Sequence, residues 1–231
     1  MSGETALLGR LVDLTATDGA PIAAYHVEAQ APRRGGLVLI QEIFGLTTHI
    51  REQCDRFARE GYDVLAPAIF DREAPGLDLG YAPEEVAEAI RLVRAHPLEQ
   101  TLTDADLCIE QLAAAGPVFM TGYCYGGSAS YVMACRSTRL TAAACYYGSM
   151  IPSRAHERPL CPVLVHFGRE DVEIPMDAVE AFRDARPDVE VQLYPAGHGF
   201  NSDRRDDYDA ASARLAFERT LAFFDAASAA R

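Results

Sequence analysis

The sequence predicts one α/β domain in which helices flank both faces of a mostly parallel β-sheet. Short β-like runs alternate with helical patterns along the chain, which is typical of such a sheet. The chain has 231 residues, 49% of them hydrophobic, and can therefore bury a substantial core. No repeat, low-complexity tract or linker divides the sequence, so we expect a single domain over residues 1–231.

The predicted sheet begins with an antiparallel pair. Leu11–Thr15 and Ile22–Glu28 flank the turn signal Asp18-Gly19, which favours a hairpin. Gly36–Glu42 begins with a continuous apolar run, as expected of a strand buried on both faces. Five further strands are predicted at Tyr62–Ala66, Pro117–Tyr123, Thr141–Tyr147, Val163–Phe167 and Val189–Tyr194.

Helical periodicity separates these strands. Apolar residues recur three or four positions apart, which places them on one helix face that can pack on the sheet. The predicted helices carry these residues: Ile50, Cys54 and Phe57; Val86, Ile90 and Val93 after Pro83; Leu102, Ala105, Ile109 and Leu112; Ser128–Arg136; Val179 and Phe182 after Pro175; and Phe217, Leu221 and Phe224 within Tyr208–Ala226.

Charge and composition exclude several kinds of partner. The formal net charge of −13 repels phosphate, and no basic cluster is interleaved with aromatic residues, so no nucleic-acid or anionic-membrane partner is expected. No apolar run approaches the ~20 residues that span a bilayer. The first ten residues do not resemble a signal peptide. We therefore expect a cytoplasmic protein, a monomer whose partner is a small molecule.

The cysteines fit a reducing compartment. Six are scattered along the chain without a CxxC pair, so a disulfide framework is not expected. Cys124 lies in a distinctive setting. We expect the other five to be reduced and mostly buried: Cys54, Cys108, Cys135, Cys145 and Cys161.

Cys124 occupies the centre of the segment Gly122-Tyr123-Cys124-Tyr125-Gly126-Gly127. This segment matches the nucleophile elbow G-x-S-x-G with cysteine in place of serine, between a predicted strand and a predicted helix. So sharp a turn brings the residues two positions before and after the nucleophile together, which requires glycine at both. The helix N-terminus would favour a thiolate. A glycine turn around a buried cysteine is the alternative.

An acid and a base follow in the order that this elbow requires. Asp171 lies in the loop after one predicted strand, with Glu170 and Glu173 as competitors for the same role. His198, flanked by Gly197 and Gly199, lies in the loop after the last predicted strand. A histidine oriented by a carboxylate activates a nucleophile, so the sequence predicts acyl-transfer chemistry.

The other histidines do not indicate a metal or cofactor. His166 lies within a predicted strand, where a packed side chain is expected. No histidine has a metal-ligand spacing to another histidine, cysteine or carboxylate, and no phosphate-binding glycine motif occurs. We therefore expect neither metal nor cofactor. The histidines expected to be peripheral to the chemistry are His26, His49, His96 and His156.

The chain resembles the dienelactone hydrolase family of α/β-hydrolases over nearly its whole length. The resemblance is carried by Gln41-Glu42-Ile43-Phe44-Gly45-Leu46, by the elbow, by Tyr146-Tyr147-Gly148, and by the loops holding Asp171 and Gly197-His198-Gly199-Phe200. It implies a carboxylic-ester or lactone hydrolase with the triad Cys124, Asp171 and His198, a thioester intermediate, and a preference for enol lactones or activated esters.

Further roles follow from the resemblance alone. It implies that Glu42 approaches the resting thiol, where a carboxylate disfavours the thiolate. The backbone N–H groups of Ile43 and Tyr125 correspond to the oxyanion hole. Tyr146 matches a substrate-lining tyrosine, although a core aromatic fits almost as well. A thioesterase, or a non-catalytic receptor on the same fold, is the alternative function.

The resemblance is weaker where the substrate would bind. Related enzymes clamp a substrate carboxylate with arginines, one of them four residues after the catalytic histidine. That position is Ser202 here. The arginines left to bind an anionic group are Arg72, Arg204 and Arg205. The sequence leaves the physiological substrate open.

Overall fold

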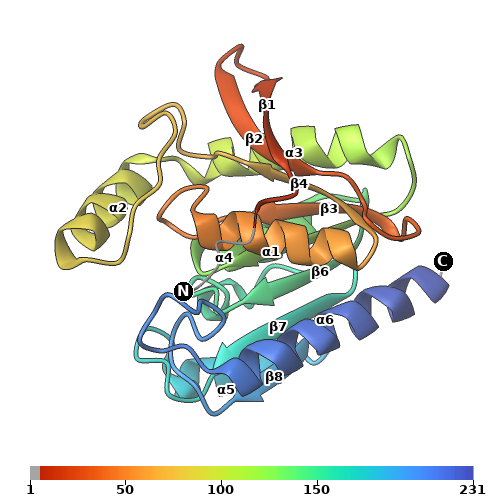
Figure 1. The fold of residues 1–231 in the computed structure, drawn as a ribbon. Coiled ribbons are helices and arrows are strands. Elements are labelled where there is room, and N and C mark those ends of the chain that lie inside the picture. Colours follow the sequence, from red (N-terminus) through yellow and green to blue (C-terminus); the bar gives the residue numbers. More distant parts are fainter. Residues whose placement is uncertain (1–5, 231) are drawn as a thin grey trace.

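Eight strands form one sheet in the order β1-β2-β4-β3-β5-β6-β7-β8 in the computed structural model, which describes residues 6–230 (Figure 1). Strands β3 to β8 pair in parallel, whereas β1 and β2 are antiparallel to each other and β2 is antiparallel to β4. The strands are β1 Arg10–Thr15, β2 Pro21–Val27, β3 Gly35–Ile40, β4 Tyr62–Pro67, β5 Val118–Tyr123, β6 Leu140–Tyr146, β7 Val163–Gly168 and β8 Glu190–Tyr194.

Helices cover both faces of this sheet, as predicted. Helices α1 and α6 pack on one face, and α3 and α4 pack on the other (Figure 1). Helix α2 projects beside the carboxyl ends of the strands. No helix in the described part of the chain is both long and apolar enough to cross a membrane. The helices are α1 Thr48–Arg59, α2 Pro83–Ala95, α3 Leu98–Ala113, α4 Tyr125–Arg136, α5 Met176–Ala185 and α6 Ala210–Ala229, with a short 3₁₀ turn at Pro152–Arg154.

The predicted order of elements is confirmed, and two local details are corrected. Strand β3 ends at Ile40, so Glu42 lies in the following loop rather than in the strand. Helix α2 was expected to bury Val86 and Ile90, but its buried residues are Ala89 and Leu92. Val86 and Ile90 instead line a pocket that also contains Cys124 and His198.

An aromatic cluster attaches α1 and α6 to the sheet. Phe57 of α1 lies 4.9 Å from Phe217 of α6, measured between ring centroids. Phe119 of β5 lies 4.7 Å from Phe224 of α6, and Tyr62 contacts both Phe119 and Phe224 edge-on. Tilted and edge-to-face pairs of this kind add to the free energy gained by burial. The cluster therefore holds α1 and α6 against one face of the sheet.

Candidate active site

The nucleophile elbow forms where β5 meets α4. Cys124 is the single residue between them and has φ 54° and ψ −113°, a strained conformation for a residue with a Cβ. A Cβ on Gly122 would lie 2.3 Å from the carbonyl oxygen of Gly126. The backbone N–H of Cys124 donates to the carbonyl of Tyr146 at 3.0 Å. The elbow thus holds the thiol at the carboxyl edge of the sheet, above the N-terminus of α4.

Three predicted residues meet at this edge, because the loops after β5, β7 and β8 all leave the parallel part of the sheet at its carboxyl ends. His198 Nε2 lies 3.2 Å from Cys124 Sγ. His198 Nδ1 lies 2.8 Å from Asp171 Oδ2, so the proton on Nδ1 is donated to the carboxylate. The side chains of Asp171 and His198 are almost completely buried. The structure therefore brings together thiol, imidazole and carboxylate in one hydrogen-bonded chain.

The surroundings of His198 favour its protonated form. Burial acts to lower the pKa of His198, but the hydrogen bonds to Asp171 and Cys124 outweigh burial and raise that pKa to about 10. A cationic imidazole beside a sulfur atom stabilises a thiolate. The geometry therefore suits a thiolate–imidazolium pair.

Asp171, rather than Glu170 or Glu173, occupies the orienting position on Nδ1. Its second oxygen, Oδ1, accepts hydrogen bonds from the backbone N–H groups of Glu173 at 2.8 Å and Ile174 at 3.2 Å. The Asp171 carboxylate is thereby fixed on both oxygens. Glu170 is exposed. Glu173 lies on the opposite side of the imidazole, with Oε2 3.6 Å from Nε2.

Glu42 is fully buried in the loop that follows β3. Tyr81 donates its hydroxyl hydrogen to Glu42 Oε2 at 3.2 Å, while Glu42 Oε1 has no hydrogen-bond partner. The Tyr81 oxygen also lies 3.1 Å from Ser202 Oγ. Glu42 is therefore held by Tyr81 while the thiol contacts His198, and its role as resting partner of the thiol stays a prediction.

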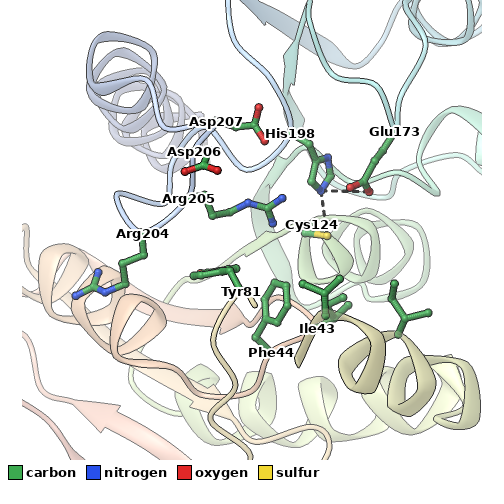
Figure 2. A pocket seen from close by; sticks show the side chains of 12 residues that line it. Ile43, Phe44, Tyr81, Cys124, Glu173, His198, Arg204, Arg205, Asp206 and Asp207 are labelled. Atoms are coloured by element: carbon green, nitrogen blue, oxygen red, sulfur yellow. Dashed lines mark hydrogen bonds and ion pairs between the residues drawn. The ribbon is translucent and has the colours of Figure 1, made fainter. Parts of the chain in front are cut away.

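A pocket of about 480 Å³ opens over Cys124 and His198 (Figure 2). Aromatic and aliphatic side chains form one part of its wall, and charged side chains form another. Such a mixture suits a small molecule with an apolar body and a polar group. The remaining lining residues are Ile43, Phe44, Tyr81, Val86, Ile90, Glu173, Arg204, Arg205, Asp206 and Asp207.

Of the three candidate arginines, Arg205 is best placed to meet a ligand. Arg72 is absent from the pocket lining and pairs with Asp104 at 2.6 Å and with Asp18. Arg204 points away from Cys124 in Figure 2 and pairs with Glu52 and Asp203.

Arg205 points toward His198 and Cys124 in Figure 2 and has no carboxylate within 4 Å among residues 6–230. Burial acts to lower its pKa, but the charges of Glu42 and Cys124 raise it above the ordinary value. Arg205 therefore directs toward Cys124 a guanidinium that contacts the Tyr81 ring, 5.5 Å from its centroid, and has no carboxylate partner among the described residues.

The structure does not bring Tyr146 to the pocket, which corrects the expectation drawn from the resemblance. Its side chain is completely buried, and its hydroxyl lies 2.7 Å from Thr220 Oγ1. Its ring packs on His166 at 4.4 Å, so the prediction of a packed His166 is confirmed. Tyr81 lines the pocket instead, from the loop before α2, where no motif indicated it.

One group of possible metal ligands was not visible in the sequence spacing. Ligand atoms of His49, Glu52 and Asp203 lie within 4.8 Å of one another. The Arg204 guanidinium already pairs with Glu52 at 2.8 Å and with Asp203 at 2.7 Å. A side-chain cation thus balances the two carboxylates, and we assign no metal site to this group.

The sheet order, the elbow and the position of the pocket define an α/β-hydrolase fold with its pocket at the carboxyl edge. The sequence model of the dienelactone hydrolase family matches residues 22–228, and the chain belongs to this family. The chain is 32% identical to the "Putative carboxymethylenebutenolidase" of Salmonella typhimurium, over 90% of this chain and 84% of that protein. It is 28% identical to "Carboxymethylenebutenolidase 1" of Cupriavidus pinatubonensis, over 91% and 94%.

A solved structure supports the same assignment. The crystal structure described as "Putative Dienelactone Hydrolase" from Klebsiella pneumoniae superposes with a TM-score of 0.83 at 30% identity, covering 96% of this chain and 99% of that one. The protein is accordingly a carboxylic ester hydrolase, a class that includes enzymes acting on lactones.

Proposed function

We propose that the protein hydrolyses enol lactones and activated esters through a covalent thioester on Cys124. The continuous chain from Cys124 Sγ through His198 to Asp171, at 3.2 and 2.8 Å, is the observation that carries the proposal. His198 acts as base and acid, and Asp171 holds the imidazole in the required tautomer and orientation.

Acylation begins when the Cys124 thiolate attacks the acyl carbon of the bound ester. Negative charge then develops on the carbonyl oxygen, which the backbone N–H groups of Ile43 and Tyr125 would stabilise. Tyr125 is the first residue of α4, so its N–H lacks an acceptor within the helix, and Ile43 lines the pocket. His198 Nε2 gives its proton to the departing oxygen, and the thioester forms.

The nucleophile determines which leaving groups are suitable. A thiolate is itself a good leaving group, so the tetrahedral intermediate goes on to the thioester most readily when the oxygen leaving group departs as easily as sulfur. Enol and phenol leaving groups meet this condition best, whereas simple alcohols and amines depart more slowly even with a proton from His198. The relatives are named carboxymethylenebutenolidase, the name of an enzyme whose substrate is an enol lactone with a carboxylate substituent.

The decisive experiment traps the intermediate. Purified protein is mixed with a stoichiometric amount of an aryl ester, quenched in acid and analysed by intact-mass and peptide mass spectrometry. We expect one acyl group, located on the peptide that contains Cys124. Initial rates should rank enol lactones and aryl esters above alkyl esters, and alkyl esters above anilides. Turnover without any acyl group on Cys124, or an acyl group on another residue, would contradict the mechanism.

Replacing Arg205 with methionine should weaken binding of anionic substrates. A buried charge-assisted hydrogen bond contributes about 1.5–3 kcal/mol, so KM for a carboxylate-bearing enol lactone should rise about 10- to 100-fold. The methyl ester of that carboxylate is the matched neutral substrate, and its KM should change little. Equal effects on both substrates would show that Arg205 acts on the shape of the pocket rather than on charge.

A further inference from the structure

His198 has a carboxylate on each side of its ring. Asp171 Oδ2 lies 2.8 Å from Nδ1, and Glu173 Oε2 lies 3.6 Å from Nε2, the nitrogen that faces Cys124 Sγ at 3.2 Å. Figure 2 shows Glu173 reaching the imidazole from the side opposite Arg205. Nothing in the proposed acylation step uses this second carboxylate.

The loop geometry places Glu173 beside the imidazole. Asp171 Oδ1 accepts the backbone N–H of Glu173 at 2.8 Å, so the carboxylate that orients His198 also fixes the backbone of Glu173. The Glu173 side chain is 53% exposed and lines the pocket, and His198 is its only ion-pair partner among the described residues. Glu173 therefore reaches both the reactive nitrogen and solvent, whereas the side chain of Asp171 is buried.

We propose that Glu173 is a catalytic residue of the deacylation step, in which it holds the hydrolytic water against His198 Nε2. This inference rests on the proposed thioester mechanism. Once sulfur carries the acyl group, Glu173 is the carboxylate that stays paired with Nε2, at 3.6 Å in the described part of the chain. A water positioned for attack gives one hydrogen to the general base, and its second hydrogen needs an acceptor. The Glu173 carboxylate provides this acceptor.

The step balances in atoms and charge. The water oxygen forms a bond to the thioester carbon while one water proton moves to His198 Nε2. The second proton stays on the oxygen and is hydrogen-bonded to Glu173. The tetrahedral intermediate then breaks its carbon–sulfur bond, releasing the carboxylic acid and returning the Cys124 thiolate to its pairing with the imidazolium. The acid loses its proton to solvent.

Single-turnover kinetics test the proposal. Wild type, Glu173→Ala, Glu173→Gln and the control Glu170→Gln are each mixed with a stoichiometric aryl ester. Phenolate release measures acylation, and intact-mass spectrometry follows decay of the acyl group on Cys124. Glu170 is a suitable control because it is an exposed carboxylate of the same loop that is absent from the pocket lining.

We expect Glu173→Ala to slow deacylation by about 10-fold or more, at the low end of acid–base contributions, so that the acyl-enzyme accumulates. Glu173→Gln, which keeps a neutral acceptor, should slow deacylation less. Acylation should stay within about twofold of wild type in both, and added formate should partly restore deacylation in Glu173→Ala only. Glu170→Gln should match wild type.

Different failures would be distinguishable. Unchanged deacylation in Glu173→Ala, or an equal loss of acylation and deacylation, would overturn the assigned role of Glu173. Turnover by a Cys124→Ala variant at the wild-type rate would instead refute the thioester mechanism on which this role depends.

Discussion

Replacing Cys124 with alanine should lower kcat/KM for aryl esters and enol lactones by at least about 10⁴-fold, as expected when a covalent nucleophile is removed. The thiol is the nucleophilic group of the elbow that contacts His198 Nε2. The pocket, the helix N-terminus and the His198–Asp171 pair should persist without it, so substrate binding should survive. Steady-state kinetics measure the loss, and equilibrium dialysis with a non-hydrolysed analogue measures binding.

Two further variants make this result specific. Cys124→Ser keeps the size of the side chain but replaces the thiol with a far less acidic hydroxyl, and it should be almost as inactive as Cys124→Ala. Cys135→Ala removes a partly exposed thiol outside the pocket lining and should retain full activity. Comparable activity in Cys124→Ala and wild type would exclude Cys124 as the nucleophile.

Replacing Gly126 with alanine should lower the stability of the fold strongly. A Cβ at this position would lie 2.2 Å from the carbonyl oxygen of Ile40 and 2.5 Å from that of Gln41. These are backbone atoms at the end of a central strand, so neither can move without shifting β3. We expect the free energy of unfolding to fall by about 3 kcal/mol, the upper range for overpacking. The midpoint of thermal unfolding should fall by about 10 °C.

Gly76→Ala is the matched control for Gly126→Ala. Gly76 has φ +71°, but a Cβ there would meet no atom within 4 Å. Only the cost of a left-handed conformation then applies, roughly 1–2 kcal/mol. Thermal unfolding followed by circular dichroism should therefore show a clearly smaller shift for Gly76→Ala than for Gly126→Ala. Equal shifts would mean that the close approach at the elbow does not govern stability.

Local sequence signals predicted the order of elements and a candidate triad, with Glu170 and Glu173 left as competitors of Asp171. The apolar runs and helical periodicities predicted the strands and helices, with differences at their ends. The elbow glycines could be interpreted from the sequence because the need for glycine there is local. Strand β5 must turn into α4 within one residue, which leaves no room for side chains two positions before and after Cys124. Asp171 and His198 were identifiable because carboxyl-end loops of parallel strands converge on one edge whatever the remaining packing is.

The lining of the pocket depended on contacts between distant segments. Tyr146 and Tyr147 are adjacent in the chain, yet Tyr147 contacts His198 at 5.2 Å between ring centroids, while Tyr146 bonds to Thr220 of α6. The helical periodicity of α2 predicts an apolar face that packs on the core, but Val86 and Ile90 of that face line the pocket. Periodicity identifies one apolar face, but it does not specify whether sheet or cavity lies opposite.

The charged groups of the site also divide into those that the sequence predicts and those that only the tertiary structure places. The sequence by itself determined that a thiol, a carboxylate and an imidazole lie in loops at the carboxyl ends of strands, because the order of elements along the chain and the positions of the loops are encoded locally. Only the tertiary structure decided which charges pair. It places Arg204 beside Glu52 and Asp203, which neutralise it. It also directs Arg205 toward the thiol and brings the Glu173 carboxylate to His198 Nε2. The physical reason is that side-chain pairing depends on separations of a few ångströms between segments distant in the chain.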